Sequence, residues 1–194
     1  MLGANELMNS RLSGSEEALA TLACAKIAGR PSPCILIGGL GMGFTLRAAL
    51  SELGKDADVV VAELVPAVVN WAKGPMAGFQ GDSLSDPRTQ IIIDDVAKLI
   101  RDGKEAYDAI LLDVDNGPDG LTKNANDYLY GNDGLARAWV ALRPGGVLAI
   151  WSAAPDAIFA GKLRSTGFDV EEHQVRARKG KSGAHHIIWL VVKQ

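Results

Sequence analysis

Short apolar runs bounded by turn residues alternate with longer stretches of helical periodicity along most of this chain. In a parallel sheet covered by helices on both faces, each strand is a nearly continuous apolar run and a helix follows it. We therefore expect an α/β fold with a doubly wound, mostly parallel sheet. The expected strands are Cys34–Ile37, Val59–Glu63, Gln90–Ile93, Ala109–Asp113 and Val147–Trp151, and the expected helices are Phe44–Leu53, Val65–Lys73, Val96–Arg101, Asp127–Leu142 and Asp156–Ser165.

The two ends of the chain depart from this alternation. An N-terminal helix is expected over Glu16–Ile27, with Ser13 or Ser15 as its cap. Near the C-terminus, Phe168–Arg176 and His185–Val192 are strand-like and a glycine-rich basic turn separates them. We expect these two segments to form an antiparallel hairpin that brings the sheet to seven strands.

Size and charge limit the class of protein. With 194 residues, of which 47% are hydrophobic, the chain can bury one core, so a single domain over 1–194 is expected, with 1–30 as an N-terminal helical segment. A net charge of −3 makes nucleic acid an improbable partner, and the absence of a long apolar run predicts a cytoplasmic protein without a membrane span. Cys24 and Cys34 show no metal-ligand spacing, so we expect reduced thiols and no metal.

A glycine-rich loop lies between the first expected strand and the helix that follows it. Its sequence is Gly38-Gly39-Leu40-Gly41-Met42-Gly43. Glycines let the backbone turn sharply and let a ligand approach closely, and the following helix offers free N–H groups at its start. We predict that Gly38, Gly39, Gly41 and Gly43 bind a nucleotide, although a tight turn without a ligand is the alternative.

An acid at the end of the second expected strand supports this prediction. Glu63 lies 20 residues beyond Gly43, where a carboxylate can accept hydrogen bonds from both ribose hydroxyls and would repel a 2′-phosphate. Phe44 stands where the dinucleotide fingerprint requires a third glycine. Together with the C-terminal hairpin, this spacing favours an S-adenosylmethionine-type nucleotide over NAD. A strand-end acid without a ligand is the alternative for Glu63.

Further acids follow the third and fourth expected strands. Asp94 and Asp95 end the third expected strand, where a carboxylate can accept a hydrogen bond from an adenine amino group, and for Asp94 a cap of the next helix is an equally good explanation. Asp113 and Asp115 follow a buried strand next to the first one, so we assign them as catalytic residues. Asp113 should also contact the nucleotide, hold an attacking amine and accept its proton. The alternative is that both aspartates shape the following loop.

Several motifs in the right order resemble the spermidine synthase family of polyamine aminopropyltransferases, within the S-adenosylmethionine-dependent methyltransferase fold. The resemblance covers most of the chain and implies that Glu63 holds the ribose, Asp95 the adenine and Asp113 the attacking amine. Gly38–Gly43 matches the family's GGGDGG loop, and Val61–Leu64 matches its VEID segment. Asp86-Pro87-Arg88 followed by Asp95 matches DPR…DG, and Tyr107–Asp113 matches YDvIi-D. Leu129-Tyr130 followed by Leu142–Gly146 matches FY…LkpgG.

The resemblance also implies a small-molecule acceptor near three residues. Glu17 falls near the acid of the family's YxE motif, Asn116 stands at the second aspartate of its DxxDP motif, and Tyr130 ends the polar loop that would enclose the acceptor. A homodimer is compatible with this assignment. The family's N-terminal β domain is largely missing from these 194 residues.

One departure from the family bears on the group that is transferred. Gly41 replaces the aspartate of GGGDGG, which in the family faces the propylamine end of decarboxylated S-adenosylmethionine. Without that acid, and with Asn116 in place of another, the preference for a cationic donor and acceptor weakens. The sequence therefore slightly favours methyl transfer from S-adenosylmethionine. Aminopropyl transfer from decarboxylated S-adenosylmethionine to a polyamine is the close alternative, and a catalytically silent nucleotide-binding module is the third.

Overall fold

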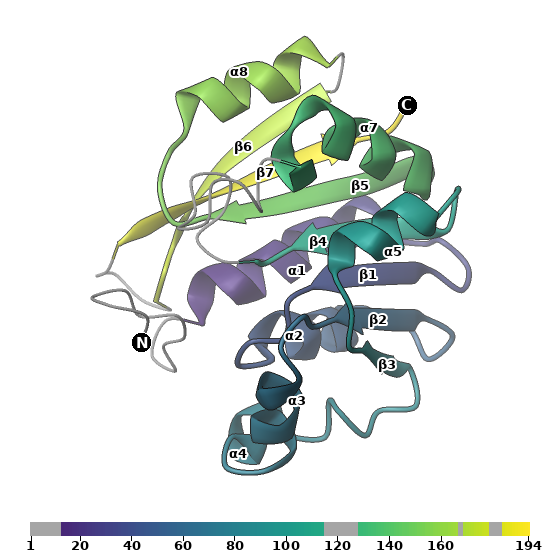
Figure 1. Ribbon diagram of the computed structural model, residues 1–194, viewed down its shortest axis with the longest axis vertical. Coiled ribbons are helices and arrows are strands. Elements are labelled where there is room, and N and C mark those ends of the chain that lie inside the picture. Colours follow the sequence, from purple (N-terminus) through teal and green to yellow (C-terminus); the bar gives the residue numbers. More distant parts are fainter. Residues whose placement is uncertain (1–12, 115–127, 167–168, 179–183) are drawn as a thin grey trace.

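Seven strands form one sheet in the order β3-β2-β1-β4-β5-β7-β6, with helices on both of its faces (Figure 1). The computed structural model describes residues 13–114, 128–166, 169–178 and 184–194. The strands are β1 (Cys34–Gly38), β2 (Asp58–Ala62), β3 (Thr89–Ile92), β4 (Tyr107–Leu112), β5 (Leu142–Ser152), β6 (Asp169–Arg176) and β7 (His185–Val192). The helices are α1 (Gly14–Lys26), α2 (Phe44–Glu52), α3 (Pro66–Lys73), α4 (Ala77–Gln80), α5 (Val96–Asp102), α7 (Asn132–Ala141) and α8 (Ala157–Ser165).

The pairing of the strands confirms the predicted fold class. β1 to β5 pair in parallel, whereas β7 runs antiparallel to both β5 and β6. The chain therefore forms a doubly wound sheet of the Rossmann-like methyltransferase type that closes with an antiparallel strand pair. None of the helices in the described part of the chain is long and apolar enough to cross a membrane.

Strands β1, β2, β4, β5 and β7 each contribute buried residues to two hydrophobic cores, because their side chains alternate between the two faces of the sheet. Leu111 packs with Leu19 of α1 and Leu46 of α2 on one face. Its neighbour Leu112 packs with Ile100 of α5 and Leu163 of α8 on the other. Burial on both faces explains why the central strands are continuous apolar runs.

Three local predictions were wrong, and the predicted cap of α1 is confirmed in position only. The short helix α4 was not expected, and the helix expected over Asp127–Leu142 is interrupted at Gly131, the N-cap of α7. β5 begins at Leu142, immediately after α7, because Leu142 pairs with Tyr107. Ser13 stands at the N-cap of α1 without a side-chain hydrogen bond, and the Ser15 hydroxyl instead contacts Nδ1 of His186 at 2.8 Å.

The DPR motif has a structural role in this chain. The Arg88 guanidinium forms hydrogen bonds with both carboxylate oxygens of Asp86. Its Nη1 also donates to the carbonyl oxygens of Leu50 and Leu53 at 3.0 and 2.9 Å, at the C-terminal end of α2. Arg88 therefore satisfies carbonyl groups that have no partner within α2 and joins that helix to the start of β3.

A buried carboxylate joins three segments at the start of β4. Asp108 accepts hydrogen bonds from Arg30 Nη1 at 2.7 Å, from Arg143 Nη1 at 2.6 Å and from the backbone N–H of Cys34 at 2.8 Å. Arg30 follows α1, Cys34 begins β1 and Arg143 lies near the start of β5. Asp108 therefore fixes these three segments to one another at the edge of the sheet opposite the glycine loop.

We expect Asp108→Asn to lower the free energy of unfolding by roughly 1–3 kcal/mol, because the two arginines lose their anionic partner. Urea denaturation at neutral pH measures the change. Asp102→Asn, at an exposed aspartate of α5, is the matched control and should change stability by less than about 0.5 kcal/mol. Equal stability of the two variants would contradict the role given to Asp108.

Candidate functional site

The ends of β1, β2, β3 and β4 meet at one edge of the sheet, and the glycine loop lies between β1 and α2 at that edge (Figure 1). Gly39 and Gly43 both have positive φ angles, of 90° and 77°. A Cβ at Gly39 would collide with the backbone oxygen of Asp113, and one at Gly43 would collide with the side-chain amide of Gln80. These two glycines are therefore required by the packing of the protein itself.

Gly41 differs from the other loop glycines. Its φ angle is 48°, and a Cβ built there has no atom within 4 Å. Of the four glycines predicted to bind a nucleotide, Gly41 thus faces open space, whereas Gly38 packs against Val96. Ligand approach was predicted to explain all four glycines. Contacts within the protein account for Gly38, Gly39 and Gly43, and for Gly41 the ligand explanation stays a prediction.

Glu63 follows β2 and fixes the glycine loop. Its carboxylate accepts a hydrogen bond from the backbone N–H of Leu40 at 2.9 Å through Oε2 and one from Val65 at 2.9 Å through Oε1. The side chain is only 7% exposed. Each carboxylate oxygen can accept a second hydrogen bond, so Glu63 can also accept from a ribose hydroxyl. That contact stays a prediction.

Asp95 lies at the end of β3 and is the N-cap of α5. Its Oδ1 accepts from the backbone N–H of Ala97 at 2.9 Å, and its Oδ2 accepts from the hydroxyl of Tyr128 at 2.7 Å. Capping, which the sequence considered for Asp94, is therefore the work of Asp95, while Asp94 forms an ion pair with Lys98. The side chains of Leu64 and Ile93, at 67% and 54% exposure, present apolar surface beyond β2 and β3.

Asp113 lies where β4 ends, next to the glycine loop. Its backbone N–H donates to the carbonyl of Gly38 at 3.0 Å, and its Oδ2 accepts from the hydroxyl of Thr45 at 2.6 Å. Thr45 belongs to the first turn of α2, so the carboxylate lies near the positive end of a helix. Burial raises the pKa of Asp113 to about 6, although the Thr45 hydrogen bond partly offsets the rise. A carboxyl with this pKa can accept a proton near neutral pH.

Glu16, on α1, is a further acid of this cluster that the sequence did not single out. Burial, followed by the negative charges of Asp113 and Glu17, raises the pKa of Glu16 to about 8. The Thr45 hydroxyl lies 3.4 Å from the backbone oxygen of Glu16. Helical periodicity would have placed Glu16 and Glu17 on different faces of α1, but which face meets Asp113 depends on how α1 packs.

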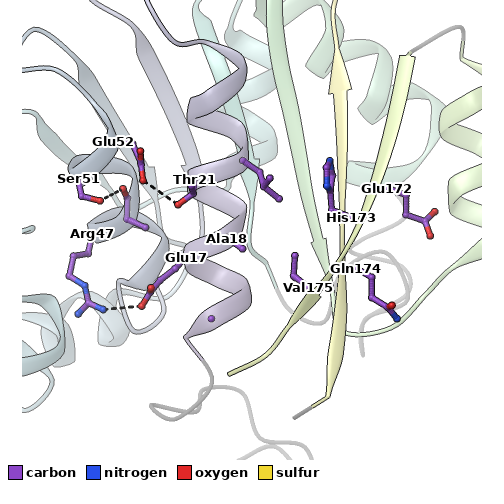
Figure 2. Close-up of a pocket in the computed structure, with 13 residues that line it drawn as sticks. Glu17, Ala18, Thr21, Arg47, Ser51, Glu52, Glu172, His173, Gln174 and Val175 are labelled. Atoms are coloured by element: carbon purple, nitrogen blue, oxygen red, sulfur yellow. Dashed lines mark hydrogen bonds and ion pairs between the residues drawn. The ribbon is translucent and has the colours of Figure 1, made fainter. Parts of the chain in front are cut away.

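Glu17, expected to bind substrate, lies elsewhere. Arg47 donates to its carboxylate at 3.3 Å, and both residues line an open groove of about 970 Å³ between α1, α2 and β6 (Figure 2). Neither Asp113, Glu63 nor the glycine loop lines this groove. Because ligands of such sheets bind beyond the carboxyl ends of the strands, we place the candidate site at that edge and not in the groove.

Tyr130 was also expected to bind substrate, but its side chain is buried in the core. It is 2% exposed and packs edge-on against Phe159 in the core beneath α5, α7 and α8, with the ring centroids 5.7 Å apart. Tyr128, two residues earlier, contacts Asp95 instead. Asp115 and Asn116 lie outside the described residues. Tyr128 was visible in the sequence only as a neighbour of Tyr130, and nothing in the sequence pointed to Thr45 or Gln80.

The sheet order and its antiparallel end define the class: an α/β protein of the S-adenosylmethionine-dependent methyltransferase fold. Residues 15–157 match the model of the spermine/spermidine synthase domain. The chain belongs to the spermine/spermidine synthase domain family. The resemblance predicted from the motifs is therefore confirmed.

Known relatives and solved structures agree with this assignment. A polyamine aminopropyltransferase of Mycobacterium tuberculosis is 28% identical over 150 residues, which are 73% of this chain and 28% of that protein. One of Saccharolobus solfataricus is 33% identical over 100 residues, 52% of this chain and 32% of that protein. This chain thus spans about a third or less of either relative.

The crystal structure of spermidine synthase from Thermotoga maritima matches the fold with a TM-score of 0.73 at 20% identity. The match covers 96% of this chain and 62% of that one. TrmN from Thermus thermophilus matches with a TM-score of 0.63 at 22% identity and covers 92% of this chain and 48% of that one. At these identities the structural matches show the fold.

Glu16 and Asp113 should make the folded protein less stable as the pH rises from about 4 to about 8. The folded state keeps both protons up to pKa values of about 8 and about 6, whereas ordinary values are 4.5 and 3.8. The folded state therefore binds more protons in this range, and its free energy of unfolding falls as the pH rises.

Urea denaturation across that range tests this linkage. Glu16→Gln should become more stable than the wild type by an amount that grows with pH up to about 8, because the variant has no Glu16 carboxyl to ionise. A difference between variant and wild type that does not change with pH would exclude the raised pKa.

Proposed function

We propose that this chain catalyses aminopropyl transfer from decarboxylated S-adenosylmethionine to an amine of a polyamine. Membership of the spermine/spermidine synthase domain family supports this function, and so do curated relatives named polyamine aminopropyltransferases. Methyl transfer, which the sequence slightly favoured, has no support among these relatives. We therefore propose aminopropyl transfer, the close alternative that the sequence offered.

The position of Asp113 is the observation on which the proposal depends. Its carboxylate lies between the glycine loop and the first turn of α2, and its pKa of about 6 suits a group that accepts a proton near neutral pH. In the proposed reaction a neutral amine attacks the carbon bonded to the sulfonium sulfur. The carbon–sulfur bond breaks with its electron pair on sulfur, methylthioadenosine leaves, and Asp113 takes the proton of the new ammonium.

The nucleoside of the donor would lie along the ends of β1 to β3. Glu63 would accept hydrogen bonds from the ribose, because its carboxylate is already oriented by Leu40 and Val65. The exposed side chains of Leu64 and Ile93 would cover the faces of the adenine, and Asp95 would accept from its amino group. The Tyr128 hydroxyl donates to the same carboxylate, so it would shift its position when the adenine binds.

Asp113→Asn should lower kcat by about a hundredfold or more, because the amide cannot accept the proton of the attacking amine. The assay measures methylthioadenosine formed from decarboxylated S-adenosylmethionine and putrescine. Asp102→Asn is the control and should keep full activity. The thermal unfolding of both variants shows whether the fold is intact.

The outcome of this assay separates the three functions. S-adenosylhomocysteine formed from S-adenosylmethionine by the wild-type protein would indicate methyl transfer and contradict the proposal. Binding of the nucleoside without any product would favour the catalytically silent module.

Gly41→Asp should strengthen the preference for decarboxylated over intact S-adenosylmethionine by about tenfold, because the new carboxylate attracts an ammonium and repels a carboxylate. A Cβ at this position has no atom within 4 Å, and aspartate tolerates a φ angle of 48° better than most residues do. Calorimetric titration of the variant and wild type with both nucleosides measures the ratio. Gly41→Asn is the uncharged control, and an equal gain with asparagine would show that charge is not the cause.

A further inference from the structure

The Glu16 carboxyl has no role in the site proposed so far, although the backbone oxygen of Glu16 and the carboxylate of Asp113 contact the same Thr45 hydroxyl. Its Oε2 is buried and forms no hydrogen bond within the described part of the chain. Asp113, Glu16 and Thr45 meet where α1, α2 and β4 come together. A buried carboxyl oxygen without a partner is costly, so its presence requires an explanation.

A second buried polar atom without a partner lies on the same side of Asp113. Trp151 follows Ile150, which pairs with Leu112, so the sheet places Trp151 beside Asp113. Trp151 is 9% exposed, and its indole Nε1 forms no hydrogen bond within the residues that the structure describes. An acid oxygen on α1 and an N–H group on β5, each buried and without a hydrogen bond in the described residues, thus belong to the two elements that meet beside Asp113.

His186 joins these two groups. Its ring packs edge-on against Trp151, with centroids 4.8 Å apart, and its Nδ1 contacts the hydroxyl of Ser15, the residue before Glu16. Burial, followed by the neighbouring His185, lowers the pKa of His186, so this histidine favours its neutral form. It therefore fixes the start of α1 against the end of β5 without neutralising Glu16.

The charges around Glu16 are mostly negative. The negative charges of Asp113, directly after β4, and of Glu17, the next residue of α1, both disfavour its ionised form. Arg47 of α2 is directed to Glu17 at 3.3 Å on the groove side. An arriving cation between Glu16 and Asp113 would relieve this repulsion and favour the ionised form of both carboxyls.

We propose that Glu16 and Asp113 together hold a primary ammonium group of a substrate, with Glu16 supplying the negative charge that the glycine loop lacks at Gly41. This inference rests on the proposed function and deepens it. Two groups share the required chemistry: the aminopropyl end of decarboxylated S-adenosylmethionine and the far ammonium of a polyamine acceptor. Glu16 gives its proton to the solvent when the ammonium binds.

Calorimetric titration at pH 7 of the wild type, Glu16→Gln and the control Glu52→Gln distinguishes the two sources. Glu52 is an exposed acid of the neighbouring helix α2. The ligands are decarboxylated S-adenosylmethionine, methylthioadenosine, which lacks the ammonium, and putrescine added in the presence of methylthioadenosine. Glu16→Gln should weaken the binding of one of the two cationic ligands by about tenfold. It should change the affinity for methylthioadenosine by less than about twofold.

If Glu16→Gln binds decarboxylated S-adenosylmethionine more weakly, the ammonium held by Glu16 and Asp113 is that of the donor. If it binds putrescine more weakly, the ammonium is that of the acceptor. Titration in buffers of different ionisation enthalpy adds a readout that a purely structural role would not change. The wild type and Glu52→Gln should release up to about one proton per ligand bound, and Glu16→Gln should lose this release.

Equal affinities of wild type and Glu16→Gln for both cationic ligands, with unchanged proton release, would overturn the inference while the proposed function stands. Binding of no nucleoside by the wild type would instead overturn the proposed function, and the inference with it. Glu16→Gln replaces a carboxyl that is mostly protonated at pH 7 by a neutral amide of the same shape, so we expect it to fold. Its thermal unfolding confirms that.

Discussion

The geometry of the candidate site depends on how closely β1 and β4 continue side by side beyond their last paired residues. The N–H of Asp113 donates to the carbonyl of Gly38, and the backbone oxygen of Asp113 fills the space that a side chain at Gly39 would need. The glycine loop and the aspartate are therefore fixed by one another. This contact places a carboxylate beside the loop and at the start of α2, where Thr45 holds it.

The acids Glu63 and Asp95 at this edge of the sheet each have a structural role in the folded chain, independent of any ligand. Glu63 ties the glycine loop to the end of β2, and Asp95 caps α5 and accepts from Tyr128. Because backbone N–H groups orient these carboxylates in the folded chain, a ligand would meet groups already in position, which lowers the cost of binding. The structural role that the sequence offered as an alternative for each acid is thus compatible with the functional one.

The distribution of negative charge separates this chain from the pattern of the family that it resembles. The glycine loop has no acid at Gly41, but α1 brings Glu16 to the same cluster as Asp113. Burial raises the pKa of both carboxyls, and the negative charges of Asp113 and Glu17 raise that of Glu16 further, so the charge of this cluster responds to a cation that binds there. A cation-binding function can in this way persist although the acid comes from another element.

The sequence by itself determined the doubly wound sheet, the antiparallel end, the glycine loop and the acids Glu63, Asp95 and Asp113, because these depend on local periodicity and on fixed positions after strands. The early start of β5 at Leu142 depends on pairing with Tyr107, a residue distant in the sequence, and could not be derived locally. Only the tertiary structure decided that Glu16 rather than Glu17 meets Asp113, that Tyr130 is buried and Tyr128 is at the site, and that Gln80 lies against Gly43. Adjacent or nearly adjacent residues of one helix point in different directions, and the packing of that helix against the sheet selects which of them reaches the site.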